Sequence, residues 1–167
     1  YCGVRGFCVI MAKSHSEERG REKMRIKIAV CDDSTVDQQY VSDMVDRWAV
    51  QRGHTVHIDT FISAESFLFH YAEESDYDIL LLDIEMGEMD GVTMARQLRR
   101  SNEAVQIIFI TGHSDYISEG YEVEALHYLM KPVREEKLHS VLDRAVEKLA
   151  KNEKVLDLES GGEMVRV

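Results

Sequence analysis

The sequence predicts an α/β fold: a flavodoxin-like, doubly wound parallel sheet of (βα)5 topology with strand order 2-1-3-4-5. Short apolar runs alternate five times with segments whose apolar residues recur at helical spacing, an order typical of a parallel sheet with helices on both faces. Two of the runs, 77–83 and 105–111, are apolar without alternation, as in strands buried on both faces. Right-handed crossovers and five strands then favour this order.

The first strand is predicted at 25–33, where the run RIKIAVCDD ends in two acids. The helix predicted at 34–50 begins at Ser34, a residue type that favours the N-cap. Its apolar stripe consists of Val41, Met44, Val45 and Trp48. A second strand is predicted at 54–61, because HTVHIDTF alternates between apolar and polar residues.

The middle of the chain continues the alternation. A short helix is predicted at 63–72, followed by the strand 77–83, and the helix 91–101 leads to the strand 105–111. The face of the short helix that points to the core consists of Phe67, Leu68 and Tyr71.

The last unit has the weakest and the clearest helical patterns in the chain. A short helix containing Gly120 is predicted at 115–123, and a strand at 125–130. The final helix is predicted at 134–152 because its apolar residues keep a helical spacing throughout. These residues are Leu138, Val141, Leu142, Ala145 and Leu149.

Composition favours one acidic domain in the cytoplasm. The chain has 167 residues, 44% of them hydrophobic, and a net charge of −11. Residues 26–167 carry 14 basic and 28 acidic side chains, so a cation or a basic partner suits this part better than nucleic acid does. The cysteines and histidines show neither disulfide nor zinc-site spacing, and no apolar run is long enough to cross a bilayer.

Three segments are expected along the chain. Residues 1–24 form an irregular leader or an added segment outside the fold, with Met11 or Met24 as the start residue, and residues 25–152 form the domain. Residues 153–167 form a linker and the start of a second domain.

Polar side chains follow the strands at one edge of the predicted sheet. Asp32 and Asp33 end the first strand, Asp83 ends the third, Thr111 ends the fourth, and Lys131 follows the fifth. Taken singly, each has an ordinary explanation as an N-cap, a strand former or a solvated charge. Because the carboxyl ends of parallel strands meet at one edge, their co-occurrence predicts a ligand site there.

The residue types at this edge predict phosphoryl transfer. Carboxylates in one crevice repel each other unless a proton or a cation lies between them, and such oxygen ligands suit Mg²⁺. Lys131 can reach a phosphate oxygen, and Thr111 supplies a hydroxyl donor. We therefore predict that the Asp83 carboxylate is a nucleophile that becomes an acyl phosphate.

From about residue 27 to 149 the chain resembles the receiver domain of two-component response regulators. The motifs that carry the resemblance are CDD (31–33), LLLDIEMGEMDG (80–91), FITGHSD (109–115) and ALHYLMKPV (125–133). The resemblance implies that Asp83 is the phosphoacceptor, that a sensor histidine kinase is the donor, and that the domain is a signalling module rather than a turnover enzyme.

The resemblance also assigns a metal site. It implies Mg²⁺ bound by Asp33 and Asp83, with Asp32 acting through water and with the backbone carbonyl of Glu85 as a further ligand. Gly87 departs from the family pattern, which usually has proline at this position, so the loop after the third strand is expected to be looser.

The resemblance implies a switch as well. Thr111 matches the switch hydroxyl, Tyr128 the switch aromatic and Lys131 the lysine of the family, and the bond between Lys131 and Pro132 is expected to be cis. Phosphorylation is expected to draw Thr111 towards the phosphate and to turn Tyr128 inward. The surface that changes would comprise 115–123, 125–130 and 134–152, where a homodimer would form.

There are two alternative functions, and the sequence argues against the second. A stand-alone receiver would act by binding a protein partner. A phosphatase of the haloacid-dehalogenase type also uses an aspartate nucleophile with Mg²⁺, but in an Asp-x-Asp motif after its first strand. Here the first strand ends in the adjacent acids Asp32 and Asp33, and the third strand carries Asp83-Ile84-Glu85, so that match fails.

The tail EKVLDLESGGEMVRV (153–167) predicts a hairpin. Leu156 and Leu158 alternate with acids, Val165 and Val167 alternate with Arg166, and two glycines lie between the runs. The segment resembles the first strands of a LytTR-type DNA-binding domain. The expectation is a transcriptional regulator truncated before that domain, which would be basic and would bind the DNA; the alternative is a disordered acidic tail.

Overall fold

The computed structural model describes residues 23–116, 118 and 122–162, and it contains one five-stranded parallel sheet. The strand order is β2-β1-β3-β4-β5, so the predicted fold class and order are confirmed. All four neighbouring pairs are parallel, and β2 and β5 form the edges of the sheet. The strands are β1 (Arg25–Cys31), β2 (Thr55–Phe61), β3 (Ile79–Leu82), β4 (Gln106–Thr111) and β5 (His127–Met130).

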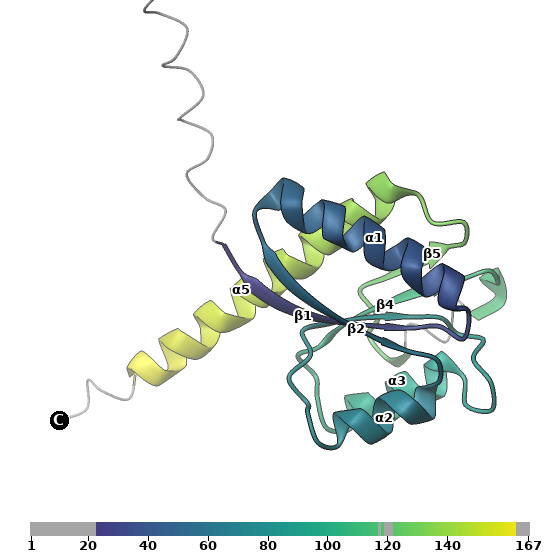
Figure 1. Ribbon diagram of the computed structural model, residues 1–167. Helices are drawn as coiled ribbons and strands as arrows, with labels where there is room; N and C mark the ends of the chain where they lie inside the picture. Colours follow the sequence, from purple (N-terminus) through teal and green to yellow (C-terminus); the bar gives the residue numbers. More distant parts are fainter. Residues whose placement is uncertain (1–22, 117, 119–121, 163–167) are drawn as a thin grey trace, which may run out of the picture.

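Helices cover both faces of this sheet (Figure 1). One face carries α1 and α5, and the other carries α2 and α3. Their bounds are α1 (Thr35–Arg52), α2 (Ala64–Tyr71), α3 (Gly91–Arg99) and α5 (Glu135–Gly162), and a 3₁₀ turn, η1, spans Ser114–Tyr116. The helix predicted at 115–123 begins within η1, and residues 117 and 119–121 of it lie outside the described residues.

Each face of the sheet has its own apolar core, because β1, β3 and β4 are buried on both sides. The core under α1 and α5 includes Trp48, which is fully buried and donates a hydrogen bond from Nε1 to Asp143 at 2.9 Å. The core under α2 and α3 centres on Phe67 and Phe109. The predicted apolar stripes of the first and last helices lie in the first of these cores.

Side-chain caps start the helices where polar residues follow the strands. The Ser34 Oγ accepts from the Asp37 backbone N–H at 3.3 Å, and the Asp90 carboxylate accepts from the Thr93 N–H at 2.6 Å. The predicted N-cap at Ser34 is therefore confirmed. α1 begins four residues after β1, and the first residue of α3, Gly91, donates from its N–H to the carbonyl of Ile84 just beyond β3, so both helix N-termini lie near the same edge of the sheet.

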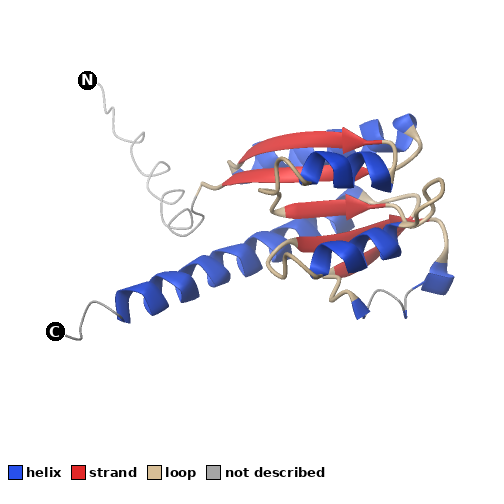
Figure 2. Cartoon of the chain, turned by 90° about the horizontal axis from the view of Figure 1, so that it is seen from below, coloured by secondary structure: helices blue, strands red, loops and turns tan. Residues whose placement is uncertain are grey.

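The hairpin predicted for the tail is wrong over residues 153–162, which are helical. The last helix does not end near Asn152 but continues to Gly162, and residues 163–167 lie outside the described residues. No proline or glycine interrupts the chain from 135 to 160, and each added helical residue gains a backbone hydrogen bond, whereas an isolated hairpin is only marginally stable. Figure 2 shows this helix extending beyond the sheet, and residues 151–158 are exposed.

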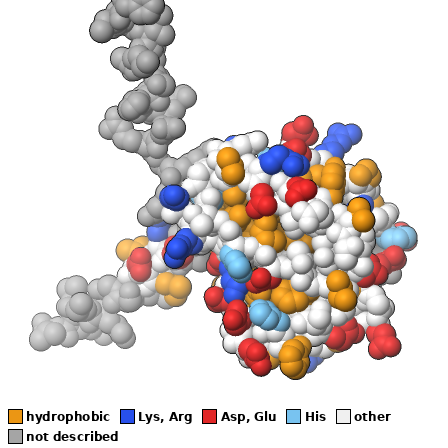
Figure 3. Space-filling model, in the orientation of Figure 1, with side chains coloured by type: hydrophobic (Ala, Val, Ile, Leu, Met, Phe, Trp, Pro, Cys, Tyr) orange, Lys and Arg blue, Asp and Glu red, His pale blue; other side chains and the backbone are white. Residues whose placement is uncertain are grey.

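The surface of the domain mixes charged and apolar side chains. The face in Figure 3 carries acidic, basic and apolar groups side by side. The exposed apolar side chains of the α5 extension are Val155, Leu156 and Leu158. In the described part of the chain, no helix is both long and apolar enough to span a membrane.

Candidate functional site

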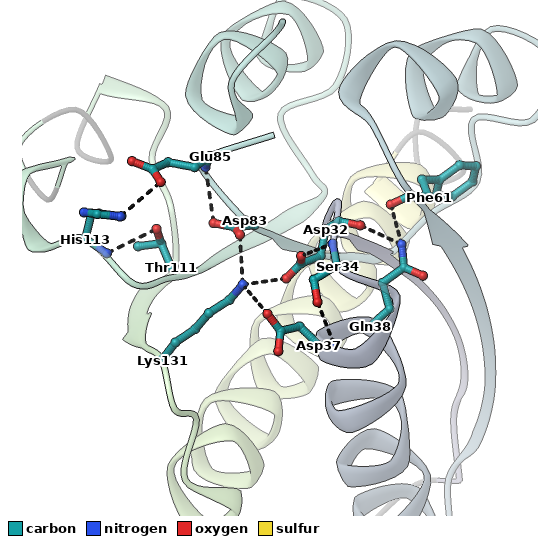
Figure 4. A network of polar contacts seen from close by, with 10 residues as sticks. All are labelled: Asp32, Ser34, Asp37, Gln38, Phe61, Asp83, Glu85, Thr111, His113 and Lys131. Carbon is teal, nitrogen blue, oxygen red and sulfur yellow. Dashed lines mark hydrogen bonds and ion pairs between the residues drawn. The ribbon is translucent and has the colours of Figure 1, made fainter. Parts of the chain in front are cut away.

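The carboxyl ends of β1, β3, β4 and β5 lie at the same edge of the sheet, and the polar residues that follow them gather there (Figure 4). Asp32 follows β1 and Asp83 follows β3, and the Asp83 backbone N–H donates to the Cys31 carbonyl at 2.8 Å. This bond continues the β1–β3 pairing by one step and fixes the two aspartates side by side. Both are nearly fully buried, with 4% and 7% of their surface exposed.

Lys131 is the centre of the polar network. Its Nζ donates to Asp32 Oδ2 at 2.7 Å, to Asp83 Oδ2 at 2.8 Å and to Asp37 Oδ2 at 3.0 Å. The peptide bond between Lys131 and Pro132 is cis. The Lys131 backbone N–H also donates to the Thr111 carbonyl at 2.9 Å, which continues the β4–β5 pairing to the start of this turn.

The network holds more negative than positive charge. Asp32, Asp33 and Asp83 each offer a carboxylate oxygen within 4.8 Å of the others, and Asp37 adds a fourth carboxylate next to the one lysine. Anionic oxygens at this spacing fit the ligand set of Mg²⁺, which takes few protein ligands and keeps several waters. The donor set therefore suits a hard divalent cation, with Asp32, Asp33 and Asp83 as the residues that would hold it.

An open cavity adjoins this carboxylate group. It has a volume of about 510 Å³, and its side chains are acidic or apolar. Its walls include Asp33, Asp83, Glu85, Glu88 and Asp90. Asp33 is exposed to this space while Asp83 is buried at its base, so a small ligand can reach Asp83 from solvent.

The pKa values of two groups in the site, Asp32 and Lys131, both lie above their ordinary values, for different reasons. Burial raises the pKa of the Asp32 carboxyl above its ordinary value, and the hydrogen bond from Lys131 opposes this without cancelling it. Burial lowers the pKa of the Lys131 ammonium, but its hydrogen bonds to Asp32, Asp83 and Asp37 outweigh burial, so this pKa lies above its ordinary value. Lys131 is therefore a permanent cation in the site.

The backbone beneath Asp83 is tightly packed. The Gly91 N–H donates to the Ile84 carbonyl at 2.8 Å, and a Cβ at position 91 would lie only 2.2 Å from the Asp83 carbonyl oxygen. The Glu85 N–H donates to Asp83 Oδ1 at 3.2 Å. The start of α3 and the loop after β3 thus fix both the backbone and the carboxylate of Asp83.

Thr111 and Tyr128 meet at His113 rather than at the carboxylates. The His113 N–H donates to Thr111 Oγ1 at 3.4 Å, and the Tyr128 hydroxyl donates to the His113 carbonyl. In the described part of the chain, Thr111 makes no hydrogen bond to Asp83 and is fully buried. His113 in turn pairs with Glu85 through its Nε2, 3.0 Å from Glu85 Oε2, which links this group to the loop after β3.

The predicted site residues thus fall into two adjacent groups. Asp32, Asp33, Asp83 and Lys131 form the carboxylate–lysine group, whereas Thr111 and Tyr128 contact His113. The side chain of Glu85 points to His113 (Figure 4), and the role of its backbone carbonyl as a metal ligand stays a prediction.

Two residues of the network were not predicted from the sequence. Asp37 contacts Lys131, and the buried Gln38 donates from Nε2 to the Asp32 carbonyl at 2.7 Å and to the Phe61 carbonyl at 2.9 Å. Both lie in the first turn of a helix that starts two residues after Asp33. That short distance along the chain is the signal that places them near the strand tip.

Comparison with known proteins gives one consistent family. Residues 28–143 match the model of the response regulator receiver domain. The transcriptional regulatory protein NatR of Bacillus subtilis is 28% identical over 123 residues, which are 74% of this chain and 51% of that protein. The sensory transduction protein LytR of Streptococcus agalactiae is 27% identical over 135 residues, which are 80% of this chain and 53% of that protein.

A solved structure gives the same result. The DrrB receiver domain from Thermotoga maritima, in its BeF3-activated form, superimposes with a TM-score of 0.61 at 26% identity, over 74% of this chain and 99% of that chain. The chain spans about half the length of the curated relatives it matches.

Proposed function

The chain belongs to the response regulator receiver family, and we propose that its Asp83 accepts a phosphoryl group from a sensor histidine kinase. The observation that carries the proposal is the position of Asp83. It is the buried carboxylate that contacts Lys131, belongs to the carboxylate group suited to Mg²⁺ and also lines the open acidic cavity. The nucleophile, the fixed cation and the access route meet at this one side chain.

The proposed reaction needs little covalent chemistry from the protein. An Asp83 oxygen attacks the phosphorus of a phosphohistidine, the P–N bond breaks, and its electron pair stays on the imidazole nitrogen. The product is an acyl phosphate, which water later hydrolyses to phosphate and the free carboxylate. When bound, Mg²⁺ would neutralise charge on the phosphoryl oxygens.

Lys131 would stabilise the phosphoryl group with its permanent charge. Its ammonium lies 2.8 Å from Asp83 and needs only a short movement to reach a phosphoryl oxygen. Because the domain brings its own lysine and carboxylates to the reaction, it would catalyse its own phosphorylation and dephosphorylation without acting as a turnover enzyme.

The switch would work through His113. The Thr111 hydroxyl accepts from the His113 N–H and keeps its own proton free to donate to a phosphoryl oxygen. A shift of Thr111 towards the phosphate would reach Tyr128 through His113, whose carbonyl accepts from the Tyr128 hydroxyl, and Tyr128 would turn inward. These changes would reach the surface of β5 and α5, together with the helix predicted from the sequence at 115–123. A groove of about 570 Å³ along β5 and α5 supports this surface as a partner site, for a second copy of the chain or for an output domain. Its basic side chains are His127, Lys131, Arg134, Lys137 and Arg144.

The proposed output is transcriptional. NatR is named a transcriptional regulatory protein and LytR a sensory transduction protein, and the acidic receiver gives little electrostatic attraction for DNA. We propose that DNA is bound by an effector domain outside this chain, of the LytTR type that the resemblance of the tail implies, and that the protein acts in the cytoplasm. A receiver that acts alone on a protein partner is the alternative.

Intact-mass spectrometry after treatment with acetyl phosphate tests the phosphoacceptor. The wild type should gain one phosphoryl group only when Mg²⁺ is present, and Asp83→Asn should gain none. Asp46→Asn, which removes an exposed carboxylate from α1, is the matched control and should react like the wild type. If Asp83→Asn gains a phosphoryl group, the phosphoacceptor is another residue and the proposal is wrong.

A further inference from the structure

Asp37 contacts Lys131 from outside the motifs that predicted the site. It lies in the first turn of α1, and its Oδ2 atom accepts from Lys131 Nζ at 3.0 Å. The same Nζ donates to Asp32 at 2.7 Å and to Asp83 at 2.8 Å. An ammonium group has three N–H donors, so the three carboxylates together occupy every donor of Lys131.

Asp37 differs from the other two carboxylates in its position. It does not belong to the group of Asp32, Asp33 and Asp83, whose oxygens lie within 4.8 Å of one another. A divalent cation held by that group would therefore compete with Lys131 for Asp32 and Asp83 but not for Asp37. In Figure 4, Asp37 and Asp83 lie on different sides of the ammonium. Movement of Lys131 towards a group attached to Asp83 is movement away from Asp37.

Packing does not fix the end of the Lys131 side chain. A cavity of about 350 Å³ lies between α1 and the turn at Pro132, and its walls include Asp37, Tyr40 and Lys131. The Lys131 side chain is 22% exposed, so the carboxylates set the position of its ammonium group. Asp37 itself is well placed to hold it, because its N–H donates to the N-cap Ser34 and its charge is favourable at a helix N-terminus.

We propose that Asp37 is a positioning residue that holds the Lys131 ammonium in the unphosphorylated domain and thereby slows phosphorylation of Asp83. This inference rests on the proposed function. A phosphoryl group bonded to Asp83 places its oxygens beyond the carboxylate, so Lys131 must advance to bind them and must give up the contact with Asp37. Asp37 sets the rate through Lys131 and contributes no atom to the reaction.

The rate of phosphorylation by acetyl phosphate at saturating Mg²⁺ tests this role. Asp37→Asn keeps the shape of the side chain and removes its charge, and its rate should rise about two- to fivefold, the range for a partly exposed ion pair. Asp46→Asn removes an exposed charge from the same helix without a contact to the site and should change the rate by less than about 1.5-fold.

A double-mutant cycle separates a contact from a general charge effect. If Asp37 acts through Lys131, Asp37→Asn should give no increase in a Lys131→Ala background. An increase that persists without Lys131 would overturn the proposal, because it would come from the charge of Asp37 acting directly on the incoming phosphodonor.

A second measurement does not depend on phosphorylation. Hydrogen exchange of the Lys131 ammonium protons, followed by ¹⁵N NMR, should be faster in Asp37→Asn than in the wild type and unchanged in Asp46→Asn. Equal exchange in Asp37→Asn and the wild type would overturn the proposal even where phosphorylation is undetectable. Failure of the wild type to accept a phosphoryl group would instead contradict the proposed function, while the exchange still reports the contact.

Discussion

Replacing Gly91 by alanine perturbs the backbone directly beneath Asp83. The new Cβ would lie 2.2 Å from the Asp83 carbonyl oxygen, 3.1 Å from the Asp83 carbonyl carbon and 3.2 Å from Ile84 Cα. Non-bonded carbon and oxygen atoms in close contact lie about 3.3 Å apart, so the methyl group requires a displacement of about 1 Å. The clashing atoms are all backbone, and a side-chain rotation cannot relieve the clash.

The expected cost follows from this displacement. Overpacking a well-packed site costs about 1–3 kcal/mol, and a clash with backbone belongs at the upper end of that range. Alanine gains up to about 1 kcal/mol over glycine from its higher helix propensity at the start of α3. The net loss in free energy of unfolding should therefore be about 2 kcal/mol. Phosphorylation should slow as well, because the Asp83 carboxylate moves with its backbone.

Urea unfolding followed by circular dichroism measures this loss. The matched control is Gly112→Ala, which lies at the same edge of the sheet directly after Thr111 and whose Cβ would meet nothing within 4 Å. Its stability should stay within about 0.5 kcal/mol of the wild type. A Gly91→Ala protein as stable as the wild type, or a Gly112→Ala protein equally destabilised, would refute the packing argument.

Three further predictions concern the rest of the domain, each measured by urea unfolding. Trp48→Ala should lower the free energy of unfolding by about 3–5 kcal/mol, because it empties a fully buried site and removes the indole N–H that donates to Asp143. The control Val50→Ala changes a side chain that is 82% exposed and should lower it by less than about 0.5 kcal/mol. Burial raises the pKa of Asp78 above its ordinary value, so its contribution to stability is present below the unfolded-state pKa of about 3.9 and is lost as pH rises through the folded-state pKa. Asp78→Asn should therefore gain stability relative to the wild type as the pH rises above about 4, and a difference in stability that does not change with pH would contradict this assignment. Within α5, Leu138 is fully buried, and Leu138→Ala should lower the free energy of unfolding by about 2–5 kcal/mol. Leu156 is 65% exposed, and Leu156→Ala should lower it by less than about 0.5 kcal/mol. Equal losses in the two variants would show that the extension packs against the domain.

The sequence was sufficient for the fold because burial and periodicity agree along most of the chain. The strands at 77–83 and 105–111 read as apolar without alternation, and β3 and β4 are buried at every position. Asp32, Asp83 and Lys131 lie at one edge of the sheet because each follows the carboxyl end of a strand and all the strands are parallel.

The sequence was not sufficient to predict structure where the hydrophobic pattern was short, or contacts between residues far apart along the chain. Two alternating leucines, Leu156 and Leu158, suggested a strand, but they are also compatible with an exposed helix, and the helix extends to Gly162 because nothing in the preceding residues ends it. The contact of Asp37 with Lys131 spans 94 residues. Because Asp37 lies in the first turn of α1, it must lie near the end of β1, but this position does not specify which side chain it contacts.

The uninterrupted course of α5 has a mechanical consequence. The helix begins at Glu135, four residues after Lys131, and its 28 residues form a rod about 42 Å long. Its first four turns are anchored in the core, while residues 150–162 extend about 20 Å further. A tilt of about 5° about the first residue of the helix would displace its far end by about 4 Å, because the displacement grows with distance along the rod. The extension thus enlarges, at its distal end, any change in helix angle that begins next to the lysine of the site.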